Sequence, residues 1–367
     1  MSVSAKKEVL EFHVGKHGGI KYNFYKQKIL DFSISVNPFR PSPRVRKVIK
    51  NISFTQYPDI KSTILRNKLS AFHNISADSI LVTNGTAQAI WLIPLAYLNH
   101  EDIVLILAPT FEEYRVACQI QGAIIHFIWA FEGNQFNPNI DDIISNVSRY
   151  KPKLVWICNP NNPTGVYINK ETVEKILQVC IETGSLLILD EAYINFVENP
   201  WPTISFIKTK HCIILRSMTK DFALTGLRLG YILADPDIIQ IFEKVQYPWS
   251  VNIAAHSAGC SALDSIKYYK KTWIKCKTLT HSLRSNLINS GFNVISTSTN
   301  FMLINLKNIQ NKDKLFQFLL DHNIYVRDCA SFKLPEYIRI GTHCQKENRR
   351  LIKLFKMFYK NNFIRKE

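Results

Sequence analysis

The sequence predicts an α/β protein with a large domain built on a mostly parallel sheet and a smaller α+β domain. Short apolar runs alternate with helix-length segments through the middle of the chain, which is typical of right-handed β-α-β crossovers and of a sheet buried on both faces. After about residue 252 the pattern changes to a long helical stretch followed by short strands and helices. The 367 residues are enough for two such domains.

The large domain is expected over residues 46–252. Its strands are the apolar runs SILVT (79–83), IVLILA (103–108), AIIHFIW (123–129), KLVWICN (153–159), SLLILD (185–190), CIILRS (212–217) and LGYILA (229–234). Helix-length segments between them cover residues 85–99, 112–121 and 169–183.

The small domain is expected to combine residues 1–45 with residues 253–367. Its elements are a helical stretch over 252–289, the strand region 292–306, a helix near 313–321, the strands IYVRD and YIRIG, and an amphipathic helix from Gln345. The amino-terminal string FSISVNPFRPSP contains prolines that favour an extended crossing segment.

Composition excludes several classes of protein. The formal charge of +17 is dispersed along the chain, which is typical of a solvated surface, and we expect no nucleic-acid partner. No apolar run reaches the roughly 18 to 20 residues of a membrane helix, and the first residues do not resemble a secretion signal. The eight cysteines form no CxxC pair, so we expect no metal site and a cytoplasmic location.

Four motifs follow apolar runs, at the sheet edge where open α/β proteins bind ligands. In TNGTAQA, Gly85 and Thr86 open a helix whose first backbone N–H groups suit a phosphate. In NPNNPTG (159–165), prolines and asparagines favour a turn that presents amide side chains. In ILDEAY, Asp190 ends a buried strand, and a carboxylate there needs a partner.

The fourth motif contains a lysine. Lys220 ends the string SMTK, and GLRLGY with Arg228 follows it. An amine in a low-dielectric pocket near cations loses part of its preference for the proton, and a free amine can condense with an aldehyde. The motif is therefore suited to an aldehyde cofactor.

Together, NPNNPTG, DEAY, SMTK and GLRLGY resemble the fold type I pyridoxal-phosphate enzymes of the class I/II aminotransferase family, and the resemblance covers nearly the whole chain. It implies a three-layer α/β/α large domain, pyridoxal 5'-phosphate as the cofactor, and a homodimer with shared active sites.

The resemblance assigns catalytic roles around the cofactor ring. Lys220 would hold the aldehyde and Asp190 the pyridine nitrogen. Asn162 and Tyr193 would contact the phenolate oxygen. Phe111 of APTFEEY would stack on the ring.

The resemblance also implies a phosphate site. Ser217, Arg228 and the backbone of Gly85 and Thr86 would bind the phosphate of the cofactor. Tyr57, in QYPD, would reach the cofactor phosphate of the neighbouring subunit.

Further strings resemble the threonine-phosphate decarboxylases of cobalamin biosynthesis more than histidinol-phosphate aminotransferases. These strings are KHGG (16–19), ILDFSISVNP (29–38), YPWSVN (247–252) and VRDCASFKLPEYIRI (326–340). By this likeness His17, Arg327 and Arg339 would hold the phosphate of the substrate, and Asn37 would also contact the substrate.

The function expected from the sequence is therefore decarboxylation of L-threonine O-3-phosphate or L-serine O-phosphate to an amino-alcohol phosphate for the cobamide linker. The alternative is an aminotransferase of the histidinol-phosphate type. A more distant alternative is a noncatalytic regulator that keeps this fold and binds nucleic acid.

Overall fold

A seven-strand sheet forms the centre of the larger lobe in the computed structural model, which describes residues 3–10, 18–19 and 29–360. Its strands are β2 (Ile80–Thr83), β3 (Ile103–Ala108), β4 (Ile124–Trp129), β5 (Leu154–Cys158), β6 (Leu186–Asp190), β7 (Cys212–Ser217) and β8 (Gly230–Leu233). The order is β2-β8-β7-β6-β5-β3-β4, and among these described strands β8 alone runs opposite to the other six. The prediction of a mostly parallel sheet is confirmed.

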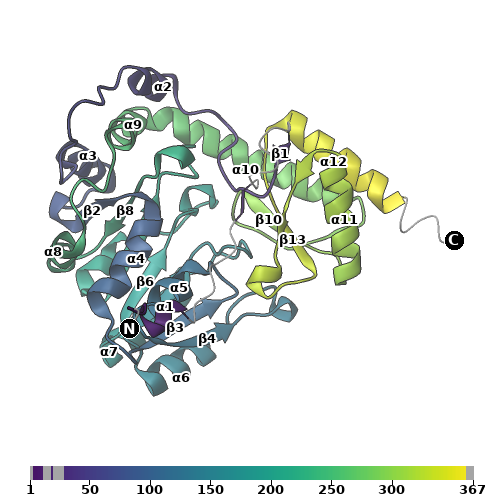
Figure 1. The fold of residues 1–367 in the computed structure, drawn as a ribbon. Coiled ribbons are helices and arrows are strands. Elements are labelled where there is room, and N and C mark those ends of the chain that lie inside the picture. The colour runs from purple at the N-terminus through teal and green to yellow at the C-terminus, as the bar shows by residue number, and fades with distance from the viewer. Residues whose placement is uncertain (1–2, 11–17, 20–28, 361–367) are drawn as a thin grey trace.

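Helices cover both faces of this sheet (Figure 1). Alternate strand residues point to opposite sides: Val104 and Ile106 belong to one apolar core, and Leu105 and Leu107 to the other. The first core is closed by α4 (Gly85–Tyr97), α5 (Glu113–Gln119) and α8 (Pro236–Val245). The second is closed by α3 (Thr63–His73), α6 (Ile140–Tyr150), α7 (Lys170–Thr183) and α9 (Ile253–Asp264). The lobe therefore has the expected three layers.

The smaller lobe contains an antiparallel sheet of order β12-β13-β10-β9. Its strands are β9 (Asn293–Val294), β10 (Phe301–Asn305), β12 (Arg327–Asp328) and β13 (Tyr337–Gly341). Helices α11 (Ile309–Asp321) and α12 (Gln345–Tyr359) pack on it around a separate apolar core. This arrangement matches the α+β pattern read from the sequence.

The amino-terminal segment joins the two lobes. Helix α1 (Lys7–Leu10) precedes strand β1 (Leu30–Asp31), which pairs in parallel with β11 (Ile324–Tyr325) of the smaller lobe. The chain then crosses to the large lobe, where helix α2 (Pro43–Lys50) begins with Ser42 as its cap and buries Val45 in the large core. The proline-rich string is thus an extended crossing segment up to α2.

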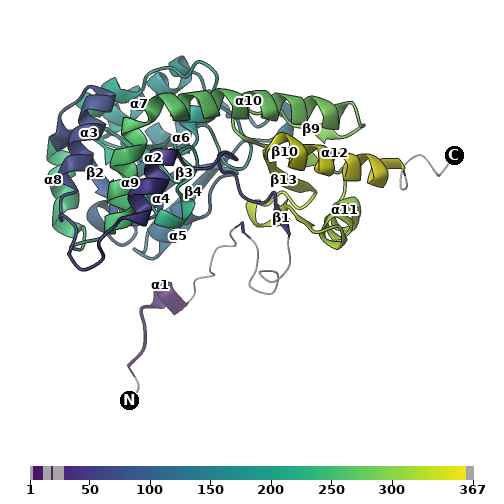
Figure 2. The same ribbon diagram turned by 90° about the horizontal axis from the view of Figure 1, so that it is seen from above.

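The change from the large core to the small core falls inside α10 (Ile266–Ile288). This helix runs along both lobes in Figure 2. Trp273 lies in the large core and Leu283 in the small one. Helix α9 also packs on the large sheet, so residues after 252 contribute to both cores. The division of domains at residue 252 stays a prediction.

Among the described helices, none is both long and apolar enough to cross a lipid bilayer.

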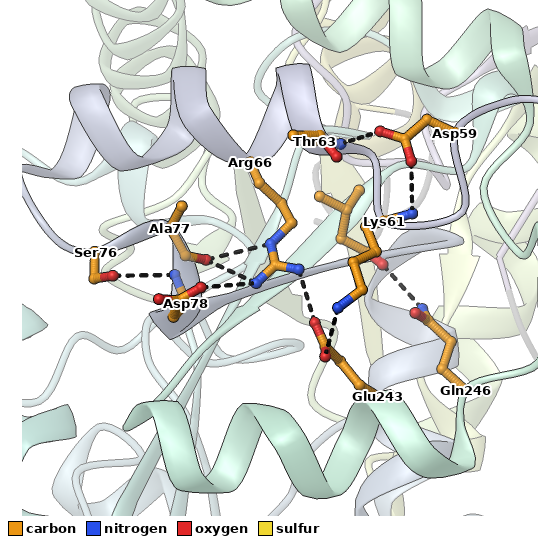
Figure 3. Close-up of polar contacts among 10 residues, drawn as sticks. Asp59, Lys61, Thr63, Arg66, Ser76, Ala77, Asp78, Glu243 and Gln246 are labelled. Atoms are coloured by element: carbon orange, nitrogen blue, oxygen red, sulfur yellow. Dashed lines mark hydrogen bonds and ion pairs between the residues drawn. The ribbon is translucent and has the colours of Figure 1, made fainter.

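A buried arginine of α3 forms an ion pair with a glutamate of α8 (Figure 3). Arg66 donates from Nε and Nη2 to the carbonyl oxygen of Ala77, at 3.3 and 3.0 Å, and from Nη1 to Glu243 Oε1 at 2.7 Å. Lys61 Nζ lies 3.2 Å from the other oxygen of Glu243. Burial raises the pKa of Glu243, but the bonds from Arg66 and Lys61 outweigh burial, and the pKa lies below its ordinary value of 4.5.

We predict that Arg66→Ala lowers the free energy of unfolding by about 2 kcal/mol at neutral pH, because the variant leaves a carboxylate and a carbonyl short of donors. The pKa of Glu243 is lower in the folded protein than in the unfolded chain. Its contribution to stability is therefore complete above pH 4.5 and is lost as pH falls through the folded-state pKa. The difference from wild type should therefore shrink in acid. Denaturant unfolding at several pH values measures it.

Lys175→Ala is the matched control, because Lys175 pairs with Glu171 on an exposed face of α7 and its loss should change nothing measurable. A difference for Arg66→Ala that stays constant from neutral pH to about pH 3 would show that the ion pair is not its cause.

Candidate active site

A cavity of about 350 Å³ is lined by residues at the carboxyl ends of the large sheet and by residues of both lobes. The larger lobe contributes Thr86, Phe111, Tyr114, Cys158, Asn162, Asp190, Tyr193, Lys220 and Arg228. The smaller lobe contributes Arg327, Phe332 and Arg339, and the amino-terminal segment contributes Gly18 and residues 33–36. The structure thus brings most of the residues singled out in the sequence to one place.

Lys220 lies in the connection between β7 and β8, with its side chain lining the cavity. Its carbonyl oxygen accepts a bond from Asn37 N at 2.8 Å, and its Nζ lies 5.9 Å from the centre of the Tyr193 ring. Burial lowers the pKa of Lys220; Asp190 opposes this effect and Arg228 adds to it. The amine is therefore easier to deprotonate than an ordinary lysine.

Asp190 is the last residue of β6 and is buried. Its Oδ1 accepts a bond from Ala192 N at 3.0 Å, and its Oδ2 accepts one from the hydroxyl of Tyr114 at 2.7 Å. Burial raises the pKa of Asp190, while these two bonds and the charge of Lys220 act against it. A further cation in the cavity would favour the ionised carboxylate.

Asn162 and Tyr193 stand beside these groups. Asn162 Oδ1 accepts a hydrogen bond from Arg339 Nη1. Tyr193 packs edge-on against Phe301, with ring centres 5.0 Å apart, and burial raises the pKa of its hydroxyl to about 12. The hydroxyl of Tyr193 is therefore protonated at neutral pH.

The start of α4 forms one end of the cavity. Its cap residue, Asn84, makes no side-chain bond to the first turn, and the first N–H groups of a helix have no partner within it. Gly85 has φ +70°, and a Cβ there would lie 2.9 Å from Arg228 Nη2. The absence of this side chain lets the guanidinium reach the helix start, which makes a site for an anion.

Arg327 and Arg339 line the opposite part of the cavity. They are direct partners on the antiparallel strands β12 and β13. Arg327 Nη2 donates to Ser331 Oγ at 2.8 Å, and Arg339 Nη2 donates to the carbonyl oxygen of Ser33 at 2.8 Å. Arg339 Nε is buried, and no described residue provides an acceptor for it.

Other predicted site residues lie away from the cavity lining. The amide of Asn37 donates to Asp221 O at 2.8 Å and to Thr272 Oγ1 at 2.9 Å, so both its N–H bonds are used within the protein. Ser217 is buried, and its hydroxyl lies 2.6 Å from Thr219 Oγ1. The contact of Asn37 with the substrate stays a prediction.

The structure does not place Tyr57 or His17 in the cavity. Tyr57 is exposed and lies 4.6 Å, ring to ring, from Trp249, outside the cavity. His17 falls outside the described residues. Among the described residues no group of three histidine, cysteine or acidic side chains gathers as a metal site would require.

Comparison with known proteins identifies the family. The family model for aminotransferase class I and II matches residues 27–355. The chain belongs to this family. A histidinol-phosphate aminotransferase from Methanococcus aeolicus is 28% identical over 344 residues, which cover 91% of each chain.

Two solved structures are similar to this aminotransferase-family chain. The histidinol-phosphate aminotransferase from Sinorhizobium meliloti in complex with pyridoxal 5'-phosphate has a TM-score of 0.88 at 22% identity, covering 98% of this chain and 99% of that one. The L-threonine-O-3-phosphate decarboxylase from Porphyromonas gingivalis has a TM-score of 0.77 at 25% identity, covering 89% and 99%.

This aminotransferase-family chain is pyridoxal-phosphate dependent, and its cavity fits the cofactor. The uncapped start of α4 and Arg228 suit the phosphate, and the buried carboxylate of Asp190 suits a protonated ring nitrogen. Lys220 offers the amine. When bound, the cofactor supplies an aldehyde that accepts amines and a ring that withdraws electrons. Because burial lowers its pKa, Lys220 Nζ would be suited to take a proton from a bound substrate and return it.

We predict that Lys220→Ala removes the visible absorbance of the purified protein, because the variant has no amine at the floor of the cavity to hold the aldehyde. An absorption spectrum measures it. Lys277→Ala is the control: burial also lowers the pKa of Lys277, but its Nζ donates to Val197 O and does not line the cavity. A coloured Lys220→Ala protein with an unchanged spectrum would contradict the assignment.

Proposed function

We propose that this enzyme transfers the amino group of a phosphate-bearing amine, of the L-histidinol phosphate kind, to a 2-oxo acid. The observation that supports this substrate class most is the pair Arg327 and Arg339. The two residues are partners on adjacent strands and line the same cavity as Lys220.

Two guanidinium groups this close repel each other. Burial lowers the pKa of Arg327, and the charge of Arg339 lowers it further. A phosphate monoester carries about two negative charges and offers several oxygens, so it can accept bonds from both arginines at once. In L-histidinol phosphate one CH₂–O unit separates the phosphate from the carbon that bears the amine. A phosphate held by the arginines would therefore leave the amine near Lys220.

The relatives support the aminotransferase reading over the decarboxylase reading expected from the sequence. The Methanococcus aeolicus relative and the Sinorhizobium meliloti structure reported above both carry the name histidinol-phosphate aminotransferase. Decarboxylation of L-threonine O-3-phosphate is the second candidate. It is supported by the likeness to the Porphyromonas gingivalis decarboxylase, and the same arginine pair would suit its substrate phosphate.

Purified enzyme should form glutamate from 2-oxoglutarate when L-histidinol phosphate is the amino donor. With unphosphorylated L-histidinol we expect kcat/KM to fall about a hundredfold, because the bonds to both arginines are lost. Carbon dioxide released from L-threonine O-3-phosphate or L-serine O-phosphate, without any 2-oxo acid, would favour the second candidate. No turnover of either kind would refute both.

In the same assay, the variant Arg327→Gln distinguishes binding of the donor's phosphate from the rate of the reaction itself. We expect the KM for the phosphorylated donor to rise about tenfold or more with little change in kcat, because Arg327 lies one strand farther from Asn162 than Arg339 does.

We also propose that the enzyme is a homodimer. Apolar side chains are exposed between residues 54 and 64, and Tyr57 packs there on exposed Trp249. A second copy of the chain would cover this patch and place Tyr57 near its neighbour's cofactor, as the family resemblance implies. Light scattering should give twice the mass of one chain, and Tyr57→Asp with Trp249→Asp should favour the monomer. A wild-type monomer at micromolar concentration would oppose the proposal.

The eight cysteines, all within the described residues, are unpaired thiols. This state supports the reducing environment of the cytoplasm as the place of action.

A further inference from the structure

Tyr114 lines the candidate cofactor site and contacts Asp190. Neither the motifs nor the family resemblance singled it out. It lies in α5 and its side chain is almost completely buried. Its ring stacks on Trp156, with ring centres 4.8 Å apart and planes at 15°, and meets Phe111 edge-on at 5.8 Å. Packing on both sides fixes the direction in which its hydroxyl points.

The hydroxyl of Tyr114 points at Asp190. It donates to Oδ2 at 2.7 Å, while Oδ1 accepts from Ala192 N. A carboxylate oxygen can accept two bonds, so Oδ2 keeps capacity for a partner in the cavity that Asp190 lines. Tyr114 and Ala192 therefore hold the carboxylate of Asp190 from both oxygens and leave it capacity for a further partner.

The electrostatics agree with this geometry. Burial raises the pKa of Asp190, and the bond from Tyr114 is the largest effect acting against it. Burial also raises the pKa of Tyr114 well above its ordinary value of 10, with the charge of Asp190 adding to the effect. The phenol is therefore protonated at any working pH and always available as a donor.

We propose that Tyr114 is a positioning residue for the cofactor: its hydroxyl holds Asp190 ionised and aimed at the ring nitrogen of pyridoxal phosphate. This inference rests on the cofactor and on no particular reaction, and it is tested without substrate. Its failure would leave the proposed aminotransfer untouched, and failure of that reaction would leave this inference standing.

The experiment titrates cofactor-free protein with pyridoxal phosphate and follows the visible absorbance. Tyr114→Phe keeps the ring and removes only the hydroxyl. We expect about tenfold weaker binding, since a hydrogen bond to a charged group is lost. The second ligand is the cofactor analogue with carbon in place of the ring nitrogen. The variant should bind this analogue no more weakly than wild type does, because the analogue cannot pair with Asp190.

Two further proteins complete the test. Tyr231→Phe is the matched control: Tyr231 is also buried, and its hydroxyl lies 2.9 Å from His73 Nε2, but it does not line the cavity. It should bind both ligands like wild type. In an Asp190→Asn background, Tyr114→Phe should have little further effect on affinity for pyridoxal phosphate.

The outcomes separate a positioning role from a structural one. Selective loss of affinity for the ligand with a ring nitrogen supports the proposal. Equal loss for both ligands would show that Tyr114 only shapes the wall of the cavity. Unchanged affinity for both, or an undiminished effect in the Asp190→Asn background, would show that the hydroxyl does not act through Asp190.

Discussion

The site depends on placing opposite charges, those of Lys220 and Asp190, in one enclosed cavity at the carboxyl edge of the sheet. Burial lowers the pKa of the amine and raises that of the carboxyl, so burial alone would neutralise both groups. Each charge partly offsets the burial cost of the other. The balance leaves an amine that can be deprotonated and a carboxylate that favours a cation, which are the two properties the cofactor requires.

The smaller lobe and the amino-terminal segment complete the site through Arg339. This side chain bonds to Asn162 of the large lobe and to the backbone of Ser33 in the crossing segment. One guanidinium group of the smaller lobe therefore contacts two other parts of the chain. Its strand neighbour Arg327 adds a second positive charge. The substrate anion would thus be held by the same group that contacts the cofactor side of the cavity.

The strands of the large sheet could be predicted closely because they are buried on both faces and so are continuous apolar runs. The run 185–190, for example, becomes β6 over Leu186–Asp190. Helix α3 was not predicted. Its first residue follows Ser62, which has a left-handed conformation and makes no capping bond, and its buried Arg66 interrupts the apolar face.

The same contrast applies to the site. Lys220, Asp190 and Gly85 follow apolar runs, so their meeting at one edge could be predicted. The contact of Tyr114 with Asp190 joins residues 76 positions apart and depends on how α5 packs over β5, which no local pattern encodes. The bonds of the Asn37 amide to Asp221 and Thr272 likewise join residues far apart in sequence, so no local pattern predicted them.

Chemical trapping tests the central claim most directly. Borohydride reduces a linkage between an amine and the cofactor aldehyde to a stable bond, and mass spectrometry of the digested protein then locates the attached pyridoxyl group. The account predicts this group on the peptide that contains Lys220. A pyridoxyl group on another lysine, or on none in protein loaded with the cofactor, would contradict it.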